Sequence, residues 1–446
     1  MSKKIDLLKD KEFKLIIKYM VPCVLGMLGL SLCILVDTIF IGRSLGDLGL
    51  AALNIALPTY NVFNAIALTF GVGGATVLAI SMGEKKLDKV NEIFTTAMVG
   101  SICISLFISL MNILFIDKIC YALGASSVTF PLVKKYVEVI LFFNWAFILI
   151  CILNVFVRCD KAPKLAMVAM ISSNMTNIIL DYIFIFPMNM GMGGAALATA
   201  LAQVVGIAIL LLHFIKRNNT MSFKFKTFSF KTLGRVLRTG ATSFITELSS
   251  GFIIFIFNLS VFNLLGDIGV SAYGIITNII LIFTAVFNGI SQGIQPLISI
   301  NYGAKKHDRV TNFYNLSIII AFTLGAIFLI LGLLFPEKLI GMFSKDKGEL
   351  LKITIQGTKI YFFGLLLIGV NIINIGYLQA IEKSKVSLCL SLLRGMVFIT
   401  ILVSILPKFF HINGVWATVP VTEILTLISF IILKKYISKK EEVVIN

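Results

Sequence analysis

The sequence predicts an all-α membrane protein whose twelve transmembrane helices form two parallel six-helix repeats. Of its 446 residues, 58% are hydrophobic and 14% are charged, which is more apolar surface than a soluble domain can bury. Windows of about 20 apolar residues, enough to cross a ~30 Å hydrocarbon core, begin near residues 14, 50, 93, 135, 165, 193, 238, 270, 311, 355, 386 and 412. The windows near 135 and 355 are the weakest, because lysine and glutamate side chains crowd their starts.

Two motifs recur at a constant spacing of 220 residues. LGDLG at 45–49 returns as LGDIG at 265–269, and MGEKKLDKV at 82–90 returns as YGAKKHDRV at 302–310. Because each half has an even number of spans, both halves have the same orientation, and a pseudo-twofold axis lies along the membrane normal. Transporters built from parallel repeats hold their substrate between the halves.

The repeat predicts a first lobe at residues 1–215 and a second lobe at 238–446, joined by a basic cytoplasmic linker at 216–237. Phenylalanine and lysine alternate in the linker. This pattern fits an amphipathic segment on the anionic membrane surface, and it fits a solvated loop equally well.

The net charge of +17 is concentrated in one set of alternate loops and at both termini. The positive-inside rule then places both termini in the cytoplasm. The basic residues are expected to face a lipid bilayer and not a nucleic acid. Arg394 is the one cation predicted within a span. The bias toward isoleucine, lysine and asparagine indicates an AT-rich bacterial genome, and therefore a multi-pass protein of a bacterial plasma membrane.

Four acidic residues lie deep in predicted spans, and two of them share a depth in the first lobe. Asp37 lies six residues before Arg43, and Asp181 lies six before Pro187. At 1.5 Å per residue, both lie about 9 Å from the outer boundary, as does Thr199 in the sixth span. Asn177 lies one helical turn before Asp181 on the same helix face. The sequence therefore predicts a polar cluster in this layer.

Two carboxylates, an amide and a hydroxyl can share a proton, because like charges in a low dielectric cannot both stay ionised. The same oxygens can hold Na⁺. Under the competing interpretation, the acids are solvated or bond to neighbouring helices. Phe257 and Leu402 are the repeat equivalents of Asp37 and Asp181, so the cation site is expected in one lobe only.

The other two deep acids are Glu247 and Glu423 in the second lobe. They are candidates for binding a cationic substrate, and Glu423 could instead neutralise Arg394. Asn154 and Asn374, equivalent at the 220-residue spacing, are candidate substrate residues or helix-bonding residues.

Pro22 lies fifteen residues before Asp37 in the same span. Because proline removes a helix hydrogen bond, it marks a place where that span can bend.

An enzyme is not predicted. Gly289, Ser291 and Gly293 match the GxSxG pattern of hydrolases, but that pattern requires a strand-to-helix turn and a histidine partner, and here it lies in a helical span. Close helix packing explains it, as it does for the equivalent stretch 69–73. The seven cysteines, Cys33 among them, are interpreted as small buried residues, not as a disulfide set or metal site.

The chain resembles the multidrug and toxic compound extrusion (MATE) family throughout its length. The resemblance rests on the paired halves, VDTIFIGRSLG after the first span, the GEKK and GAKK loops, and GAALAT with its counterpart GVWAT. Pro22 with Asp37, Asn177 with Asp181, and Thr199 are similar to the branch containing DinF-like and MepA-like proteins. In that branch the matching positions form the cation site, and the proline marks the bend.

The resemblance implies a V of two lobes that exports lipophilic organic cations in exchange for H⁺ or Na⁺, as a monomer and with no cofactor. Another branch uses acids in the second lobe. Glu247 is similar to one of them, but the tenth span offers only Asn371 and Asn374. The alternative function is a flippase for a lipid-linked saccharide, although a pyrophosphate group would favour more deep cations than Arg394.

Overall fold

A computed structural model describes residues 6–216, 219–344, 346 and 348–445. Across these residues the protein is helical. The first half, up to the linker, contains α1 (Glu12–Gly83), α2 (Leu87–Ala122), α3 (Phe130–Phe142), α4 (Asn144–Cys159), α5 (Pro163–Ile185) and α6 (Gly191–Ile215). After a short 3-10 turn, η1 (Phe225–Thr227), the second half contains α7 (Phe230–Gly303), α8 (His307–Leu334), α9 (Pro336–Ile340), α10 (Glu349–Tyr361), η2 (Phe362–Gly364), α11 (Leu365–Ala380), α12 (Ser384–Leu392), the π-helical turn η3 (Leu393–Val397) and α13 (Phe398–Ile445).

The helices supply twelve membrane spans. Within the described residues, eight helical stretches, and a ninth formed by α3 and α4 with a 49° bend, are long and apolar enough to cross a membrane. Three of these stretches are α1, α7 and Ser384–Tyr436, and each contains a backbone break and has the length of two spans. Counting those three twice gives twelve, as the sequence predicts.

The breaks occur at repeat-related positions. Gly46 (φ 62°, ψ −154°) interrupts α1, and Gly266 (φ 62°, ψ −149°) interrupts α7 in the same conformation. Only glycine adopts this region readily, because it has no Cβ. The LGDLG motif therefore forms the sharp turn between the first two spans of the first half, and LGDIG forms the equivalent turn in the second half. Lys85 (φ 60°) and Lys305 (φ 58°) likewise close equivalent turns after α1 and α7.

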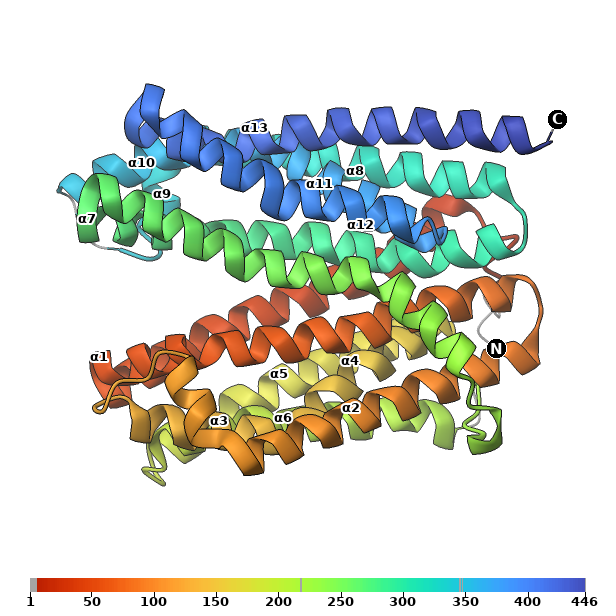
Figure 1. Cartoon of the computed structure of the whole chain (residues 1–446), viewed down its shortest axis with the longest axis horizontal. Helices are drawn as coiled ribbons and strands as arrows, with labels where there is room; N and C mark the ends of the chain where they lie inside the picture. The colour runs from red at the N-terminus through yellow and green to blue at the C-terminus, as the bar shows by residue number, and fades with distance from the viewer. Residues whose placement is uncertain (1–5, 217–218, 345, 347, 446) are drawn as a thin grey trace.

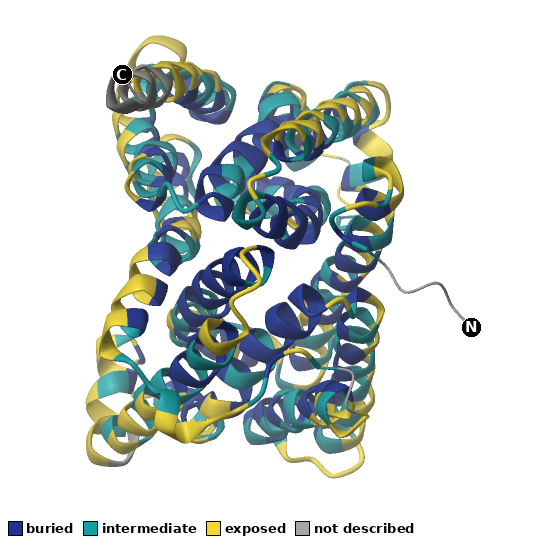
Figure 2. Ribbon diagram, turned by 90° about the vertical axis from the view of Figure 1, so that its right-hand side faces the viewer, coloured by how far each residue is buried: buried dark blue, intermediate teal, exposed yellow. Residues whose placement is uncertain are grey.

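The two halves form two layers that run side by side, with both termini at the same end (Figure 1). We call this end, which also carries Lys85 and Lys305, the terminus end. Buried residues gather on the inward faces of the helices, while the outward faces are exposed (Figure 2). Because the outward faces are apolar in a membrane protein, lipid covers them.

Glycines bring the two halves into backbone contact near the terminus end. A Cβ on Gly83 would lie 2.1 Å from the carbonyl oxygen of Ile300, and one on Gly303 would lie 2.1 Å from that of Ile80. These two contacts are related by the repeat spacing, so the pseudo-twofold axis passes between them. A Cβ on Gly289 would likewise lie 2.6 Å from Cα of Val24. Close helix packing, predicted for the GxSxG-like stretch, is confirmed.

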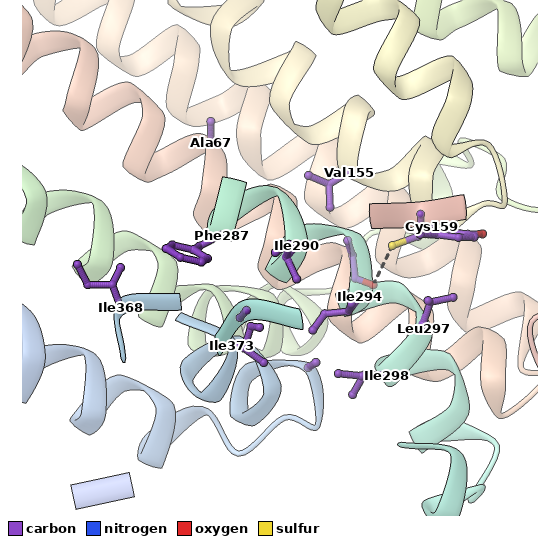
Figure 3. Packing of buried hydrophobic residues seen from close by; sticks show 14 of the residues in the cluster. Ala67, Val155, Cys159, Phe287, Ile290, Ile294, Leu297, Ile298, Ile368 and Ile373 are labelled. Atoms are coloured by element: carbon purple, nitrogen blue, oxygen red, sulfur yellow. Dashed lines mark hydrogen bonds between the residues drawn. The ribbon is translucent and has the colours of Figure 1, made fainter. Parts of the chain in front are cut away.

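One hydrophobic core crosses the boundary between the halves. Ala67 and Val155 from the first half belong to the same buried cluster as Phe287, Ile294 and Ile373 from the second (Figure 3). A second cluster, around Ile41, Phe63 and Tyr136, lies in the first half alone. The shared core therefore covers only part of the length of the first half.

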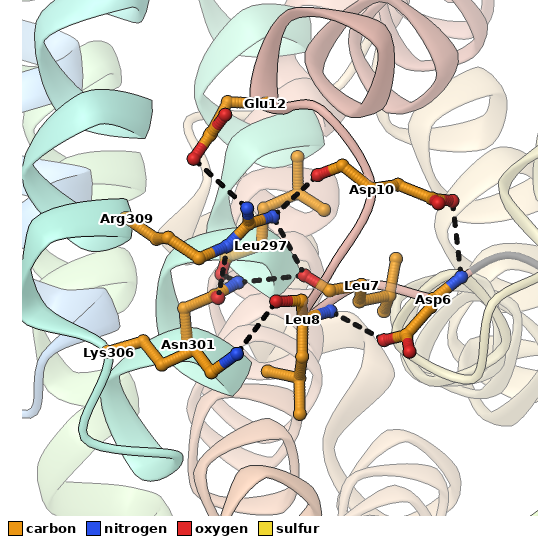
Figure 4. Close-up of polar contacts among 9 residues, drawn as sticks. All are labelled: Asp6, Leu7, Leu8, Asp10, Glu12, Leu297, Asn301, Lys306 and Arg309. Atoms are coloured by element: carbon orange, nitrogen blue, oxygen red, sulfur yellow. Dashed lines mark hydrogen bonds and ion pairs between the residues drawn. The ribbon is translucent and has the colours of Figure 1, made fainter.

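The described part of the amino-terminal segment, Asp6–Lys11, is attached to the second half. The guanidinium of Arg309 donates to the carboxylate of Glu12 at 3.0 Å and to the carbonyl of Asp10 at 2.8 Å. Lys306 Nζ donates to the carbonyl of Leu8 at 2.9 Å (Figure 4). The segment thus ties α1 to the loop between α7 and α8.

The linker packs across α2. Residues 217–218 of the predicted linker lie outside the described residues. The backbone amides of Ser222 and Lys224 donate to Asn91 Oδ1 at 2.7 Å and to Thr95 Oγ1 at 2.9 Å, while Phe223 and Phe225 are exposed.

The helix α7 begins at Phe230, earlier than the predicted residue 238. It starts there because the Ser229 side chain caps it by accepting from the amide of Thr232.

Candidate functional site

The polar cluster predicted in the first half has Asn177 at its centre. Its side-chain nitrogen donates to Asp181 Oδ2 at 2.8 Å and to Thr199 Oγ1 at 3.3 Å. Asp181 is fully buried, and its Oδ1 has no hydrogen-bond partner among the described residues. Since Asn177 and Asp181 lie one turn apart on α5 and Thr199 lies on α6, the close pairing of these two helices assembles the cluster.

Asp37 approaches the cluster from α1. Its Oδ1 is also buried, and within the described part of the chain it has no hydrogen-bond partner. Asp181 lies close enough for the two charges to interact. An isolated ionised carboxylate in hydrocarbon costs about 3 kcal/mol on insertion scales. A proton or a cation bound between the two acids would remove that cost.

Cys33 contributes to the cluster in a way that the sequence analysis missed. Its thiol donates to Asn177 Oδ1 at 2.7 Å and lies near both Asp37 and Asp181. Cys33 is therefore more than the small apolar residue that the sequence suggested. Its position one helical turn before Asp37 was a signal for it, because residues four apart share a helix face.

The repeat-equivalent position in the second half is occupied by aromatic rings. Phe257, the counterpart of Asp37, is fully buried and stacks on Tyr273 with a centroid distance of 5.3 Å. Tyr361 and Trp416 flank this pair at 6.3 Å each. At the position equivalent to Asp37, the second half thus holds packed aromatic rings in place of a carboxylate.

Glu247 lies at the boundary between the halves. It is partly exposed, and its Oε1 accepts a hydrogen bond from Asn64 Nδ2 of α1 at 2.7 Å. Tyr60 lies nearby on the same helix as Asn64 and packs edge-on against Phe147 at 5.7 Å. A carboxylate beside aromatic rings at this boundary can attract an organic cation.

Glu423 is paired with Arg394. The guanidinium donates to the carboxylate at 2.8–3.1 Å, and Asn371 Nδ2 adds a bond of 2.7 Å. Of the two interpretations open for Glu423, the structure shows the ion pair. Arg394 lies in the π-helical turn η3, a local widening that is frequent at sites with a special role.

Asn154 and Asn374 lie away from the cation cluster. Asn154 Nδ2 donates to the carbonyl of Ala166 at 2.9 Å, which joins α4 to α5. Asn374 Oδ1 accepts from the hydroxyl of Tyr314 at 2.8 Å, which joins α11 to α8. Both asparagines thus make helix-to-helix hydrogen bonds.

Pro22 does not break α1, whose one non-helical residue is Gly46. Instead it lies between Met20 and Val24, which contact Gly293 and Gly289 of α7. A bend at Pro22 would therefore change the contact between the halves.

A second cation within the helices corrects the prediction that Arg394 is the only one inside a span. Arg158, expected in a loop, lies in α4 with 1% exposure. Its Nη1 contacts Cys23 at 3.1 Å and Gln292 of the second half at 3.2 Å. The sequence placed Arg158 in a loop, but α4 continues to Cys159. The second half covers this end of the helix, so the side chain is buried.

The polar atoms of the cluster are mainly oxygens, the ligands that hard cations take. Among the described residues, no group of three or more His, Cys, Asp and Glu side chains is placed to hold a metal. The cluster offers oxygen ligands from Asp37, Asp181, Asn177 and Thr199, and these suit H⁺ or Na⁺ equally.

Two segments of the chain, residues 22–183 and 242–406, match the MatE family model. The chain belongs to the MatE family. It is accordingly a multi-pass membrane transporter and not an enzyme. The two matched segments begin 220 residues apart, so each six-span half of this MatE protein carries one copy of the family unit.

Relatives and solved structures cover nearly the whole MatE chain. The multidrug export protein MepA of Staphylococcus saprophyticus is 27% identical over 429 residues, or 95% of this chain and 94% of its own length. MepA of Staphylococcus aureus is 26% identical over 433 residues, with the same coverage. A structure described as the outward-facing conformation of a multidrug resistance MATE family transporter of the MOP superfamily shares 23% identity over 99% of both chains, with a TM-score of 0.93. The fold is therefore that of the MATE transporters.

Proposed function

We propose that this protein is a secondary active multidrug efflux antiporter, which exports lipophilic organic cations in exchange for H⁺ or Na⁺. The observation that carries the proposal is the pair of buried carboxylate oxygens, one on Asp37 and one on Asp181, that have no hydrogen-bond partner among the described residues. The family assignment and the names of the MepA relatives, which are multidrug export proteins, support it.

The two lobes, residues 1–215 and 238–446, act as the moving units, and one chain contains a complete pathway. The backbone contacts at Gly83 and Gly303 close the terminus end. With both termini in the cytoplasm of a bacterial cell, this structure is closed toward the cytoplasm. Substrate release and cation entry then take place on the outer side.

Coupling requires the ion and the substrate to prefer different states, because a ligand that binds two states equally shifts neither. Protonation or Na⁺ binding at Asp37 and Asp181 removes negative charge from the first half. This weakens its attraction for an organic cation and lets α1 bend at Pro22, which changes the packing of that helix. The substrate leaves to the outside, and the protein with its bound ion then closes on the outer side and opens toward the cytoplasm.

Glu247 is the proposed partner of the substrate charge, because it lies between the halves. Glu423 has its charge neutralised by Arg394. Asn154 and Asn374 are assigned to helix contacts and not to substrate.

The test is uptake or efflux of ethidium in proteoliposomes under an imposed pH gradient or an imposed Na⁺ gradient. Wild type should transport under one gradient, which identifies the ion. Asp37→Asn should fall to the background rate, because the amide cannot carry the charge that the ion neutralises. Asp47→Asn is the matched control, since Asp47 is an exposed acid on the same helix, and it should keep the wild-type rate.

Transport by Asp37→Asn at the wild-type rate would refute the assignment of the ion site. If folded wild type transports under neither gradient, antiport of cationic drugs is wrong, and the lipid-linked saccharide flippase becomes the next function to assay.

A further inference from the structure

A cavity of about 740 Å³ lies in the second half, away from the cation cluster. Its walls come from α8, α11 and α13, and α11 packs against the other two helices. Phe322 and Ile431 on its rim are about half exposed. Because these rim residues face outward on membrane-spanning helices, the cavity opens to lipid.

The cavity is polar at one end and apolar at the other. Its polar lining residues are Tyr314, Asn374, Lys434 and Lys435. They lie toward the terminus end, because α8 begins at that end and α13 ends there (Figure 1). Ile318 and Phe322 follow Tyr314 along α8 by one and two helical turns, about 6 and 12 Å deeper, and apolar residues of α11 and α13 line the same depth. This gradient matches the orientation of a phospholipid in the surrounding leaflet.

The polar end is assembled from all three helices. The ammonium of Lys434 lies 5.0 Å from the ring centroid of Tyr314 and 5.8 Å from that of Phe430. The hydroxyl of Tyr314 donates to Asn374 Oδ1 at 2.8 Å. The cation, the hydroxyl and the amide are therefore close neighbours.

Asn374 has an unused hydrogen-bond donor at this end. Its side chain is 1% exposed, it lines the cavity, and its Nδ2 has no partner among the residues that the structure describes. A buried donor left unpaired is unfavourable, because it has given up its hydrogen bonds to water without replacing them. A phosphate or glycerol oxygen bound beside Lys434 would supply the missing acceptor.

We propose that this cavity is a binding site for an anionic phospholipid. The phosphate group lies among Lys434, Lys435 and Asn374, and an acyl chain runs along Ile318 and Phe322. The positive charge of the two lysines selects a lipid with net negative charge over a zwitterionic one. The site is independent of the proposed transport mechanism, because none of the cation-cluster residues lines the cavity.

The experiment is native mass spectrometry of the full chain in detergent, with phosphatidylglycerol or phosphatidylcholine of identical acyl chains added. Wild type should retain more phosphatidylglycerol than phosphatidylcholine. The double variant Lys434→Gln, Lys435→Gln should lower that retention by about 25-fold, since each of the two lysines near an anionic headgroup contributes about fivefold. Lys216→Gln, which removes an exposed cation beyond the end of α6, should leave retention unchanged.

A second measurement covers the case in which the double variant does not fold. Leu367→Trp fills the apolar part of the cavity without removing a charge, and it should also lower retention. A phosphatidylglycerol with a photoreactive acyl chain should label α8, α11 or α13 in wild type and lose that labelling in Leu367→Trp. Equal retention of the two lipids, or undiminished retention in both variants, would overturn the proposal.

Discussion

Two arginines within the membrane-spanning helices have different surroundings. Arg394 donates to a carboxylate, Glu423, and Asn371 donates to the same acid. Arg158 contacts two neutral side chains, Cys23 and Gln292, and its Nε and Nη2 have no hydrogen-bond partner within the described residues. The first arrangement removes net charge, whereas the second keeps a positive charge between the halves.

The ion pair predicts a large effect when one partner is removed. Arg394→Gln should lower the free energy of unfolding by about 3 kcal/mol or more, because Glu423 then keeps a buried charge without a cation. Adding Glu423→Gln should recover most of that loss, since no charge remains and Asn371 can still donate. Thermal unfolding in detergent, followed by circular dichroism, measures both.

The matched control for this pair is Lys408→Gln, which removes an exposed cation from α13 and should leave the unfolding temperature unchanged. If the double variant is no more stable than Arg394→Gln alone, the cost does not come from the unpaired acid.

Among the helices, α1 and α7 are built on the same plan. Each is two spans long, breaks at a glycine with φ of 62°, and ends at Gly83 or Gly303. These two glycines allow the backbones to approach so closely that the equivalent carbonyls of Ile80 and Ile300 occupy the place of a side chain. The contact is made by main-chain atoms, which cannot rotate away.

Gly83→Val should therefore separate the two helices or destabilise them. Overpacking of this kind costs about 1–3 kcal/mol. We expect a lower unfolding temperature than that of Gly234→Val. Gly234 is the matched control because it lies on α7, where a Cβ would meet no described atom within 4 Å. Thermal unfolding of the two variants side by side checks this. Equal losses would show that helix propensity, and not the close contact, explains them.

At the scale of the whole molecule, the halves are held together mainly toward the terminus end. The shared hydrophobic core, the glycine contacts and the attachment of the amino-terminal segment by Arg309 and Lys306 all involve this region. The carboxylates of Asp37 and Asp181 lie farther along the first half, next to a cluster that does not cross to the second. Opening the terminus end must break these contacts.

Arg309→Ala should favour opening at the terminus end, because it removes the bonds to Glu12 and Asp10. Spin labels are attached at Asp88→Cys and Asp308→Cys, two exposed and repeat-related positions. The distribution of distances between them, measured by double electron-electron resonance, should shift to longer distances or broaden. The other exposed cysteines, Cys103 and Cys389, are first replaced by serine.

Lys385→Ala serves as the control, because it removes an exposed cation of the second half that is outside this attachment. It should give the wild-type distance distribution. An unchanged distribution in Arg309→Ala would mean that the amino-terminal segment does not hold the halves together.

The sequence by itself determined the twelve spans and the repeat, including the glycine-containing motifs at which α1 and α7 turn. Apolar length and glycine content act locally, so they can be recognised in any stretch of chain. It also grouped Asn177, Asp181 and Thr199, because helical rise converts residue number into depth.

Only the tertiary structure decided which partner each polar group takes. Asn64 and Glu247 are 183 residues apart, and Arg158 and Gln292 are 134 apart. It also placed Arg158 inside the protein and paired Glu423 with Arg394. Depth in the membrane follows from position along one helix, but the direction of a side chain and its partner depend on how the helices rotate and pack against each other.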